Sequence, residues 1–338
     1  MSAHSPFSRL EVVARTASTN TDLRRALLGP GGVLDPNSAD DWPHLSALRA
    51  VTQTAGRGRA DHVWTTPPTG ALTASIVLRP LVPANRLAWL PLLAGLAVVR
   101  ALTARLEPAG WYAATKWPND VIALPLPATP APPSVAGWGC GRKLAGILTE
   151  LIPPAGFGVD TGKLTTDPRA GVPADRAQAA AVVVGIGINL SQPARDLPVP
   201  WAASLTSLGL AVSAEAPAAV LDDCGQQLGD LLAAWEAGAG DPDAGDGALG
   251  SELRRGCATL GRFVRVAGVG GELIGTAVDL NPGLVLQTSD DGVRRRVVLG
   301  AGDVEHVRAA EAGTDPHGLD CAGEGNGSVI RRKGLPQD

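Results

Sequence analysis

The sequence predicts an α+β protein that combines a mixed β-sheet and helices in its larger part with a small all-β region near its C-terminus. Short apolar runs with strand-like alternation, separated by turn residues, recur over residues 10–188. Apolar residues at helical spacing over 86–106 and 217–236 indicate two longer helices. From residue 261 onward, five short strand-like pieces follow one another within fewer than 50 residues, which favours a small β-barrel.

The elements of the larger part can be placed in order along the chain. Strands are expected over 10–14, 46–52, 71–78, 115–117, 121–123, 144–152 and 181–188. A helix over 23–28 follows the segment 19–22, whose Thr and Asp have the spacing of a capping box. Asn85 is expected to cap the helix over 86–106, and Pro91 marks either a kink in this helix or its true start.

The chain divides into three regions. The larger part is expected to span 7–256 and the small β region 257–309, while the polar, glycine-rich tail 310–338 is predicted to be disordered. Two inserts rich in Pro, Gly, Ala or Asp, at 124–142 and 153–176, interrupt the larger part. Their composition predicts flexible surface loops.

Composition restricts the class of protein. With 338 residues, of which 45% are hydrophobic and 18% charged, the chain can bury one large and one small core. The formal net charge of −4 argues against a nucleic-acid-binding protein. Residues 1–9 are polar and lack the apolar segment of a signal peptide. The apolar run 87–99, which lies between Arg86 and Arg100, is too short to span a bilayer and suits a buried helix.

The cysteines indicate neither a metal site nor a disulfide framework. Cys140, Cys224, Cys257 and Cys321 are far apart and form no CxxC pair. A reducing cytoplasm is therefore the expected location. Because no His, Asp or Cys cluster has ligand spacing, no protein-bound metal is predicted.

The segment 53–59, Gln-Thr-Ala-Gly-Arg-Gly-Arg, is the most informative part of the sequence. It follows a predicted strand and places two arginines and two glycines in four consecutive positions. Glycine allows a backbone to approach a phosphate closely, and the planar guanidinium of arginine matches phosphate and carboxylate oxygens. A solvated run of charges is the alternative, and this segment alone does not decide between the two.

Five segments in a fixed order make the anion-binding interpretation much stronger. They are Ala-Ser-Thr-Asn at 17–20, the segment 53–59, Lys-Trp-Pro-Asn-Asp at 116–120, Arg-Lys-Leu-Ala-Gly-Ile-Leu-Thr-Glu at 142–150 and Val-Val-Val-Gly-Ile-Gly-Ile-Asn at 182–189. Together they resemble the biotin–protein ligase family over residues 10–308. The resemblance implies a class II aminoacyl-tRNA-synthetase-like catalytic domain over 7–256 and an SH3-like barrel over 257–309.

The resemblance also implies an activity. A member of this family uses ATP and Mg²⁺ to activate biotin as biotinyl-5′-AMP, and then transfers biotin to one lysine of a biotin carboxyl carrier protein. The implied enzyme is monofunctional, because the first segment lies within the first 20 residues and leaves no room for the N-terminal helix-turn-helix of a bifunctional repressor. It binds neither nucleic acid nor membrane and is a monomer or a homodimer.

The resemblance assigns three overlapping sets of site residues. The catalytic residues are Lys143, Asp120, Arg59 and Lys116. The biotin-binding residues are Ser18, Thr19, Asn20, Gln53, Gly56, Arg57, Gly58, Arg59, Lys143 and Gly146. The ATP-binding residues are Arg57, Arg59, Lys116, Asn119, Lys143, Asn189 and Trp201. No metal ligand belongs to these sets.

Elementary electrostatics explains why the chemistry needs these cations. A carboxylate brought to about 4 Å from a phosphate is repelled by roughly 4 kcal/mol at an effective dielectric constant near 20. Lys143 can bridge the two anions. Arg57 and Arg59 of the segment 53–59, which is expected to act as a flap over the ligand, can neutralise them further. Asp120 is expected to accept a hydrogen bond from the incoming lysine amine or to act as its base, with Lys116 as a partner for phosphate or for Asp120.

Several positions keep a structural alternative. The alternative role of Thr19 is that of a helix cap, and the alternative role of Lys116 and Asp120 is to support their turn. Trp201, assigned to stacking on adenine, is alternatively a core tryptophan, and His62 either replaces a basic residue usual in the family or is an ordinary loop residue. The Gly-x-Gly of 182–189 lacks the third glycine and the following acidic residue of a dinucleotide-binding fold.

Two other functions are weighed against biotin ligation. A lipoate or octanoate ligase shares the catalytic architecture, but the segments quoted above are of the biotin type. A peptide-binding role of the C-terminal barrel is disfavoured, because residues 261–308 contain a single aromatic residue, Phe263, and peptide-binding SH3 grooves are aromatic.

Overall fold

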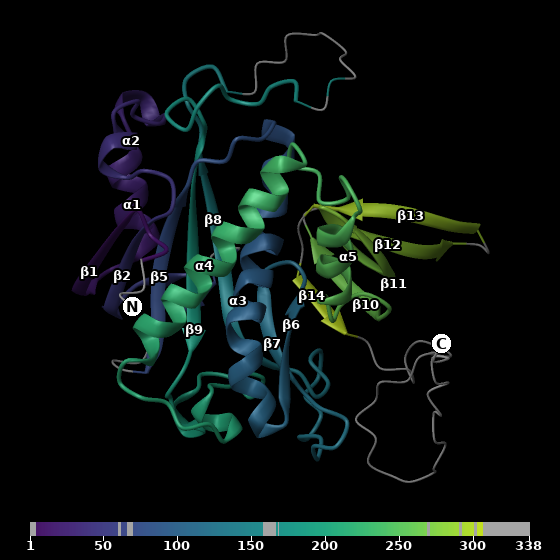
Figure 1. Ribbon diagram of the computed structural model, residues 1–338. Helices are drawn as coiled ribbons and strands as arrows, with labels where there is room; N and C mark the ends of the chain where they lie inside the picture. Colours follow the sequence, from purple (N-terminus) through teal and green to yellow (C-terminus); the bar gives the residue numbers. More distant parts are fainter. Residues whose placement is uncertain are drawn as a thin grey trace, which may run out of the picture.

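A seven-stranded mixed sheet forms the centre of the larger part (Figure 1). The computed structural model describes residues 5–59, 62–65, 70–157, 167, 169–268, 271–290, 293–300 and 303–306. The strands lie in the order β1 (Arg9–Thr16), β2 (Ser46–Gln53), β5 (Ala71–Leu78), β9 (Ala181–Asn189), β8 (Arg142–Ile152), β7 (Asp120–Pro125) and β6 (Trp111–Lys116). Only β1 and β2 are parallel within this sheet. The antiparallel pairing of β9 on both sides confirms that its glycines do not belong to a dinucleotide-binding βαβ unit.

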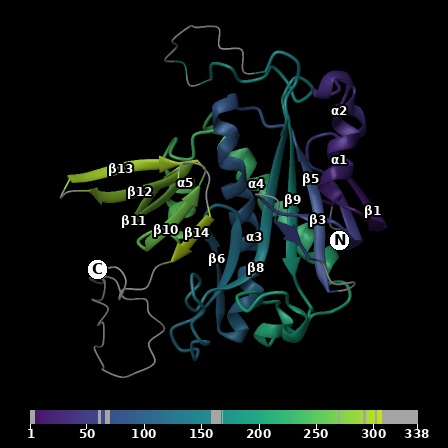
Figure 2. The same ribbon diagram turned by 180° about the vertical axis from the view of Figure 1, so that it is seen from behind.

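Helices cover both faces of the sheet. Successive residues of a strand point to opposite sides, so one strand can contribute apolar side chains to the helix packing on each face. Leu72, Ala74 and Ile76 of β5 pack with α3 (Leu90–Leu106) and α4 (Ala216–Ala237) on one face. Val77 of the same strand packs on the other face with Leu23 of α1 (Thr19–Leu27). Figures 1 and 2 show these two layers from opposite sides, with the short α2 (Ser38–Asp41) beside α1.

Both predicted helix starts need correction. The N-cap of α1 is Ser18, whose Oγ accepts a hydrogen bond from the Thr21 N–H (3.4 Å), so Thr19 is the first helical residue and not the cap. Asn85 caps no helix, because Ala84–Trp89 forms a 3-10 helix and α3 begins at Leu90. Pro91 therefore sits in the first turn of α3, where its missing N–H costs no hydrogen bond.

The helical stretch Ala84–Ala109 is longer than the apolar run visible in the sequence, because 3-10 turns extend α3 at both ends. By length and hydropathy alone, it could cross a membrane. However, 67% of its apolar window is buried inside the protein, against the sheet and α4. This burial agrees with its interpretation as a core helix.

The C-terminal strands form a separate antiparallel sheet. Its order is β13 (Val293–Leu299), β12 (Gly283–Asp290), β11 (Gly271–Asn281), β10 (Phe263–Gly268) and β14 (Asp303–His306). Five strands were predicted, and five are present in the described part of the chain. They form one antiparallel sheet with β13 and β14 as its edges, which agrees with the small β region predicted here. The tail 310–338 lies outside them.

The C-terminal sheet shares a hydrophobic core with the larger part. Val264, Leu284 and Leu286 belong to the same cluster of buried residues as α3 and α4. The helix α5 (Ala248–Arg255) connects the two parts, and its Arg254 forms ion pairs with Asp243 (2.5 Å) and with Asp279 of β11 (2.6 Å). The two parts are therefore packed as one unit.

The inserts are partly described. In the first, Val135 and Gly139 exchange backbone hydrogen bonds of 2.9 and 2.8 Å, and Arg142 donates hydrogen bonds to the carbonyl groups of Pro133, Gly139 and Gly141. This segment, predicted to be a flexible surface loop, thus contains a hydrogen-bonded turn. Of the second insert, 158–166 and 168 lie outside the described residues.

Two of the four cysteines, Cys224 and Cys257, are buried free thiols. Cys140 is disulfide-bonded, whereas the sequence predicted no disulfide framework. Burial raises the pKa of the Cys224 thiol to about 12, so this group stays protonated and unreactive.

Candidate active site

The site is a cavity of about 440 Å³ on the face of the sheet that carries α1. Segments far apart in the sequence line it: the start of α1, strands β5, β8 and β9, the hairpin of β3 (Gly56–Arg57) and β4 (Val63–Trp64), the turn before β7, and the first insert. Figure 2 shows β3 in front of the sheet. Of the predicted site residues, all line the cavity except Gly56 and Asn189.

Small polar side chains form one end of the cavity. The side-chain Oε1 of Gln53 accepts hydrogen bonds from the backbone N–H (3.0 Å) and the hydroxyl (3.3 Å) of Thr19. The Ser75 hydroxyl lies 2.7 Å from the Thr19 hydroxyl and 2.6 Å from the Asn20 carbonyl oxygen. These buried groups, together with Ser18, offer both donors and acceptors to a polar ring.

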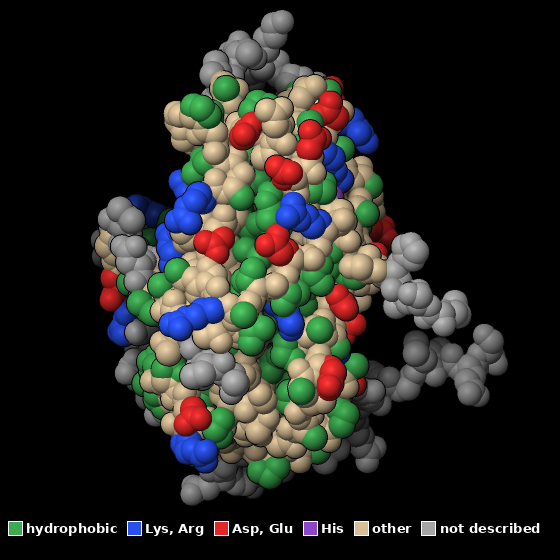
Figure 3. Space-filling model, turned by 90° about the vertical axis from the view of Figure 1, so that its left-hand side faces the viewer, with side chains coloured by type: hydrophobic (Ala, Val, Ile, Leu, Met, Phe, Trp, Pro, Cys, Tyr) green, Lys and Arg blue, Asp and Glu red, His purple; other side chains and the backbone are tan. Residues whose placement is uncertain are grey.

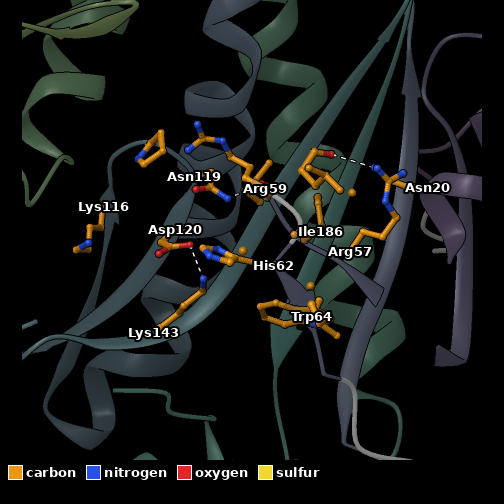
Figure 4. Close-up of a pocket in the computed structure, with 18 of the residues that line it drawn as sticks. Asn20, Arg57, Arg59, His62, Trp64, Lys116, Asn119, Asp120, Lys143 and Ile186 are labelled. Carbon is orange, nitrogen blue, oxygen red and sulfur yellow. Dashed lines mark hydrogen bonds and ion pairs between the residues drawn. The ribbon is translucent and has the colours of Figure 1, made fainter. Parts of the chain in front are cut away.

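An ion pair between Lys143 and Asp120 lies in the middle of the cavity (Figure 4). The Lys143 Nζ is 2.6 Å from the Asp120 Oδ1, and both side chains are mostly buried, with 25% and 14% exposure. Asp120 of β7 pairs with Gly146 of β8, but a register shift after Val121 pairs Ile122 with Lys143. Because paired residues point to the same side of a sheet, as do residues two apart in one strand, this shift puts Lys143 and Asp120 on the same face. The site thus contains one ammonium group and one carboxylate in direct contact.

Of the two partners predicted for Lys116, a phosphate or Asp120, the second is paired with Lys143 instead. The Lys116 Nζ donates a hydrogen bond to the Val304 carbonyl oxygen (2.6 Å) and lies 4.3 Å from the ring centroid of Trp138. In Figure 4, Lys116 is turned away from the Lys143–Asp120 pair. The reason is tertiary: β14 of the C-terminal sheet approaches the end of β6 and takes up this ammonium group.

The flap carrying the two arginines is a short hairpin over the sheet. Arg57 pairs with Glu150 of β8 (3.1 Å), and Glu150 also accepts a hydrogen bond from the Asn20 amide (2.9 Å). The Gly58 N–H donates to the His62 carbonyl oxygen (2.6 Å), which closes the turn. The Arg59 Nη1 is buried and has no hydrogen-bond partner among the described residues, as expected of a donor directed at a ligand.

Trp64 of the flap lies directly on the sheet. A Cβ at Gly187 would come within 2.5 Å of the Trp64 ring, and a Cβ at Gly146 within 3.2 Å. The Trp64 Nε1 is buried without a hydrogen-bond partner in the described part of the chain, and Lys143 Nζ is 5.8 Å from the ring centroid. The two strand glycines therefore make room for an aromatic wall beside Lys143, and the sequence had predicted room for a ligand only at Gly146.

Two tryptophans form the other end of the cavity. Trp138 of the first insert and Trp201 stack with their ring centroids 5.9 Å apart and an interplanar angle of 10°. The Trp201 carbonyl oxygen accepts the backbone N–H of Lys143 (2.7 Å), which fixes Trp201 beside the ion pair. Trp201 is therefore a cavity residue, as predicted, and not a core tryptophan.

Asn189 and Asn119 both serve the local structure. The Asn189 amide donates to the Ala203 carbonyl oxygen (3.1 Å) and accepts from the Gln192 amide (3.1 Å), so both of its ends are engaged away from the cavity. Its predicted contact with ATP has no support in this geometry. Asn119 lines the cavity, but its amide donates to the Ile147 carbonyl oxygen (2.9 Å).

Sequence reasoning missed four residues of the site: Trp64, Ser75, Trp138 and Glu150. Glu150 could have been found from the sequence, because it is an acidic residue at the end of the segment 142–150, on the same strand as Lys143. Trp138 had the signal of a large aromatic residue inside an otherwise small-residue insert. Trp64 and Ser75 gave no signal, because only the folded structure brings Trp64 to the cavity and Ser75 to the Thr19 hydroxyl.

On the face shown in Figure 3, acidic and basic side chains are interspersed. Among the described residues there is no group of three or more His, Cys, Asp or Glu that could hold a metal ion.

Comparison with known proteins identifies relatives of this chain. The model of the biotin/lipoate A/B protein ligase family matches residues 14–158. The chain is 31% identical to the biotin–[acetyl-CoA-carboxylase] ligase of Mycobacterium tuberculosis over 308 residues, which are 90% of this chain and 92% of that protein. It is also 31% identical over 156 residues to the bifunctional ligase/repressor BirA of Bacillus subtilis, covering 46% of this chain and 36% of that protein.

The fold is also found in a solved structure. The biotin protein ligase of Aquifex aeolicus in complex with biotin and ATP aligns with a TM-score of 0.57 and 22% identity, over 89% of this chain and 100% of that chain. At this identity the likeness concerns the fold. Together with the nearly full-length match to the mycobacterial ligase, it leads to one conclusion: the chain belongs to the biotin–protein ligase family.

Proposed function

We propose that this protein activates biotin with ATP to biotinyl-5′-AMP and transfers the biotinyl group to a lysine of a biotin carboxyl carrier protein. One observation carries the proposal. A single cavity joins a small polar end, the Lys143 ammonium, the flap arginines and an aromatic end. These are the groups that a ureido ring, two mutually repelling anions and a purine base require.

In the first half-reaction, an oxygen of the biotin carboxylate attacks the α-phosphorus of ATP, and the bond from this phosphorus to pyrophosphate breaks. Lys143 lies centrally and can contact both the carboxylate and the α-phosphate. Because it is paired with Asp120 at 2.6 Å, it must exchange this partner for the substrate anions. Arg59 adds charge over the phosphates from the flap, and Mg²⁺ enters with ATP, bound largely by phosphate oxygens.

In the second half-reaction, the amine of the acceptor lysine attacks the carbonyl carbon of the mixed anhydride and AMP leaves. Asp120, released from Lys143, is the carboxylate at this point of the cavity and can accept the proton of the attacking amine. The flap hairpin, with Trp64 lying on the sheet, would keep water away from the adenylate between the two steps.

The acceptor is expected to be the carrier domain of a biotin-dependent carboxylase in the cytoplasm, and the enzyme a monomer or a homodimer without DNA-binding activity. A lipoate or octanoate ligase is the alternative, because the matching family model includes these activities. The two are distinguished by substrate and not by fold.

Biotin-dependent ATP–pyrophosphate exchange tests the proposal. Wild-type protein should catalyse the exchange with biotin and not with lipoate or octanoate. Lys143→Ala should lower the rate by at least about 100-fold, because it removes the ammonium group that stabilises the negative charge developing in the transition state. Lys143→Arg should not restore it, since the branched guanidinium does not replace a compact ammonium between two anions. Exchange driven by lipoate alone would replace the proposal with its alternative.

A further inference from the structure

The first insert brings an aromatic ring to the cavity. Trp138 lies in the turn closed by Val135 and Gly139, and its own N–H donates to the Val135 carbonyl oxygen (3.0 Å). Gly137 and Gly139 have φ of 72° and 55°, conformations that favour glycine. Arg142 holds the turn through its three hydrogen bonds to insert carbonyl groups. The ring is thus presented by a turn with its own hydrogen bonds.

Trp138 also contacts two other parts of the cavity wall. Its ring stacks on Trp201, whose backbone is bonded to that of Lys143, and receives the Lys116 ammonium at 4.3 Å. Lys116 is bonded in turn to Val304 of the C-terminal sheet. Both tryptophans are half-buried and line the cavity, so their rings remain accessible to a ligand.

The cavity is chemically asymmetric. Its end at Thr19 and Gln53 is built from small polar side chains, whereas the end at Trp138 and Trp201 offers ring faces. In Figure 4, the Lys143–Asp120 pair lies between Lys116, whose ammonium group contacts Trp138, and Asn20, the neighbour of Thr19. A ligand with a small polar ring at one end, a reacting anionic centre and a planar aromatic ring at the other end matches this order.

We propose that Trp138 is a base-binding residue, and that it and Trp201 clamp the purine ring of the nucleotide between them. The inference rests on the proposed function and adds to it a positioning residue supplied by the insert of this chain. An aromatic ring inserted between two others needs about 7 Å between their planes, because each stacked pair is separated by roughly 3.5 Å. The centroids are 5.9 Å apart, so the insert turn must move outward when the base enters.

The test compares Trp138→Ala, Trp138→Phe and Val135→Ala with the wild type in biotin-dependent pyrophosphate exchange. Trp138→Ala should raise the KM for ATP by roughly 10- to 100-fold, the range found when an aromatic residue that stacks on a base is removed. The KM for biotin and kcat should change less than about threefold. Trp138→Phe should recover most of the loss, and Val135→Ala, which alters the same turn without removing the ring, should behave as the wild type.

A second readout does not depend on turnover. Adenosine, which carries no phosphate, should quench tryptophan fluorescence in the wild type, and its dissociation constant should rise by the same factor in Trp138→Ala. Equal rises in the KM for ATP and biotin, or an unchanged adenosine affinity in a folded variant, would overturn the clamp. Failure of the proposed function would look different, because wild-type protein would then show no biotin-dependent exchange at all.

Discussion

The ion pair between Lys143 and Asp120 is the residue-scale feature on which the chemistry depends. The pair is mostly buried, so neither charge can be left alone without a cost in solvation. Anionic substrates can take over the ammonium group, and the carboxylate is then left for the second substrate. One contact therefore links the two half-reactions. Substitution of Lys143 should slow the first of them, and substitution of Asp120 should slow the second.

Asp120→Asn should separate these steps. Pyrophosphate exchange should remain within a few-fold of the wild type, because Lys143 keeps its charge. Transfer of biotin from added biotinyl-5′-AMP to the carrier protein should fall by about 100-fold or more, the usual contribution of a general base. Single-turnover transfer assays measure this rate directly. Transfer at the wild-type rate would remove the role assigned to Asp120.

A second residue-scale prediction concerns stability and pH. The His44 Nδ1 accepts the Arg79 backbone N–H (3.0 Å), and burial, with Arg176 and Arg79 nearby, lowers the pKa of His44 to about 4. The pKa of an unfolded histidine is about 6.5. Between these values the unfolded chain binds a proton that the folded chain does not, so the free energy of unfolding falls as pH falls through this window. The difference corresponds to roughly 3 kcal/mol at most.

Urea denaturation at pH 7.5 and pH 5.0 measures this loss, which should be clearly smaller in His44→Gln than in the wild type. The neighbouring Glu236 does not confound the comparison. Burial would raise the pKa of this carboxyl group, but hydrogen bonds from Arg176 and the Leu81 N–H outweigh burial and hold the pKa below its usual value. Its contribution is lost only in more acidic solution. Equal losses in both proteins would exclude His44 as the cause.

At the scale of elements, the flap hairpin depends on the strands beneath it. Trp64 of β4 lies on Gly146 of β8 and Gly187 of β9, and Arg57 of β3 pairs with Glu150 of β8. The Arg57 side chain is half exposed (50%), so this pair adds little to stability and can open when a ligand arrives. The role of Gly146 and Gly187 here is steric, because a Cβ at either position would meet the Trp64 ring.

Gly187→Ala should displace the flap without disturbing the fold. The added methyl group would lie 2.5 Å from the Trp64 ring, and the hairpin must move to accept it. We expect the dissociation constant for biotin to rise by about 10-fold or more, measured by calorimetry. Gly229→Ala in α4 is the matched control, because its Cβ would meet only Leu45 at 3.6 Å, an ordinary contact. Unchanged biotin affinity in Gly187→Ala would mean that Trp64 does not wall the biotin site.

At the scale of the whole molecule, the C-terminal sheet is part of the structure that holds the site. It shares the core of α3 and α4 through residues such as Val264 and Leu286, and its Val304 binds the ammonium group of Lys116 inside the cavity wall. The protein should accordingly unfold in a single transition. Lys116, which the sequence assigned to a phosphate or to Asp120, also joins the two sheets through its hydrogen bond to Val304.

Truncation after Leu260 should lower the melting temperature strongly and abolish ligation, because it uncovers the shared core and releases Lys116. Calorimetry and the transfer assay check both effects. A chain ending at residue 309 keeps every described residue and should match the full-length protein. A stable, active protein after truncation at Leu260 would show that the sheet is dispensable.

The α+β class, most strands, the C-terminal sheet and the segments that build the site could be predicted from the amino-acid sequence, because hydrophobic periodicity and local motifs are properties of neighbouring residues. It placed Lys143, Gln53 and the flap arginines correctly in one cavity. Helix starts were less accurate, since capping depends on one backbone conformation that several polar residues can adopt, as at Ser18 and Thr19.

Only the tertiary structure decided which partners these residues have. A register shift gave Asp120 to Lys143, the approach of β14 took Lys116 away, and a turn in the insert brought Trp138 onto Trp201. Each of these contacts joins residues whose proximity depends on strand register or on packing between distant segments. Such distances are set by the shared core and by backbone hydrogen bonds, and no local pattern of residues contains them.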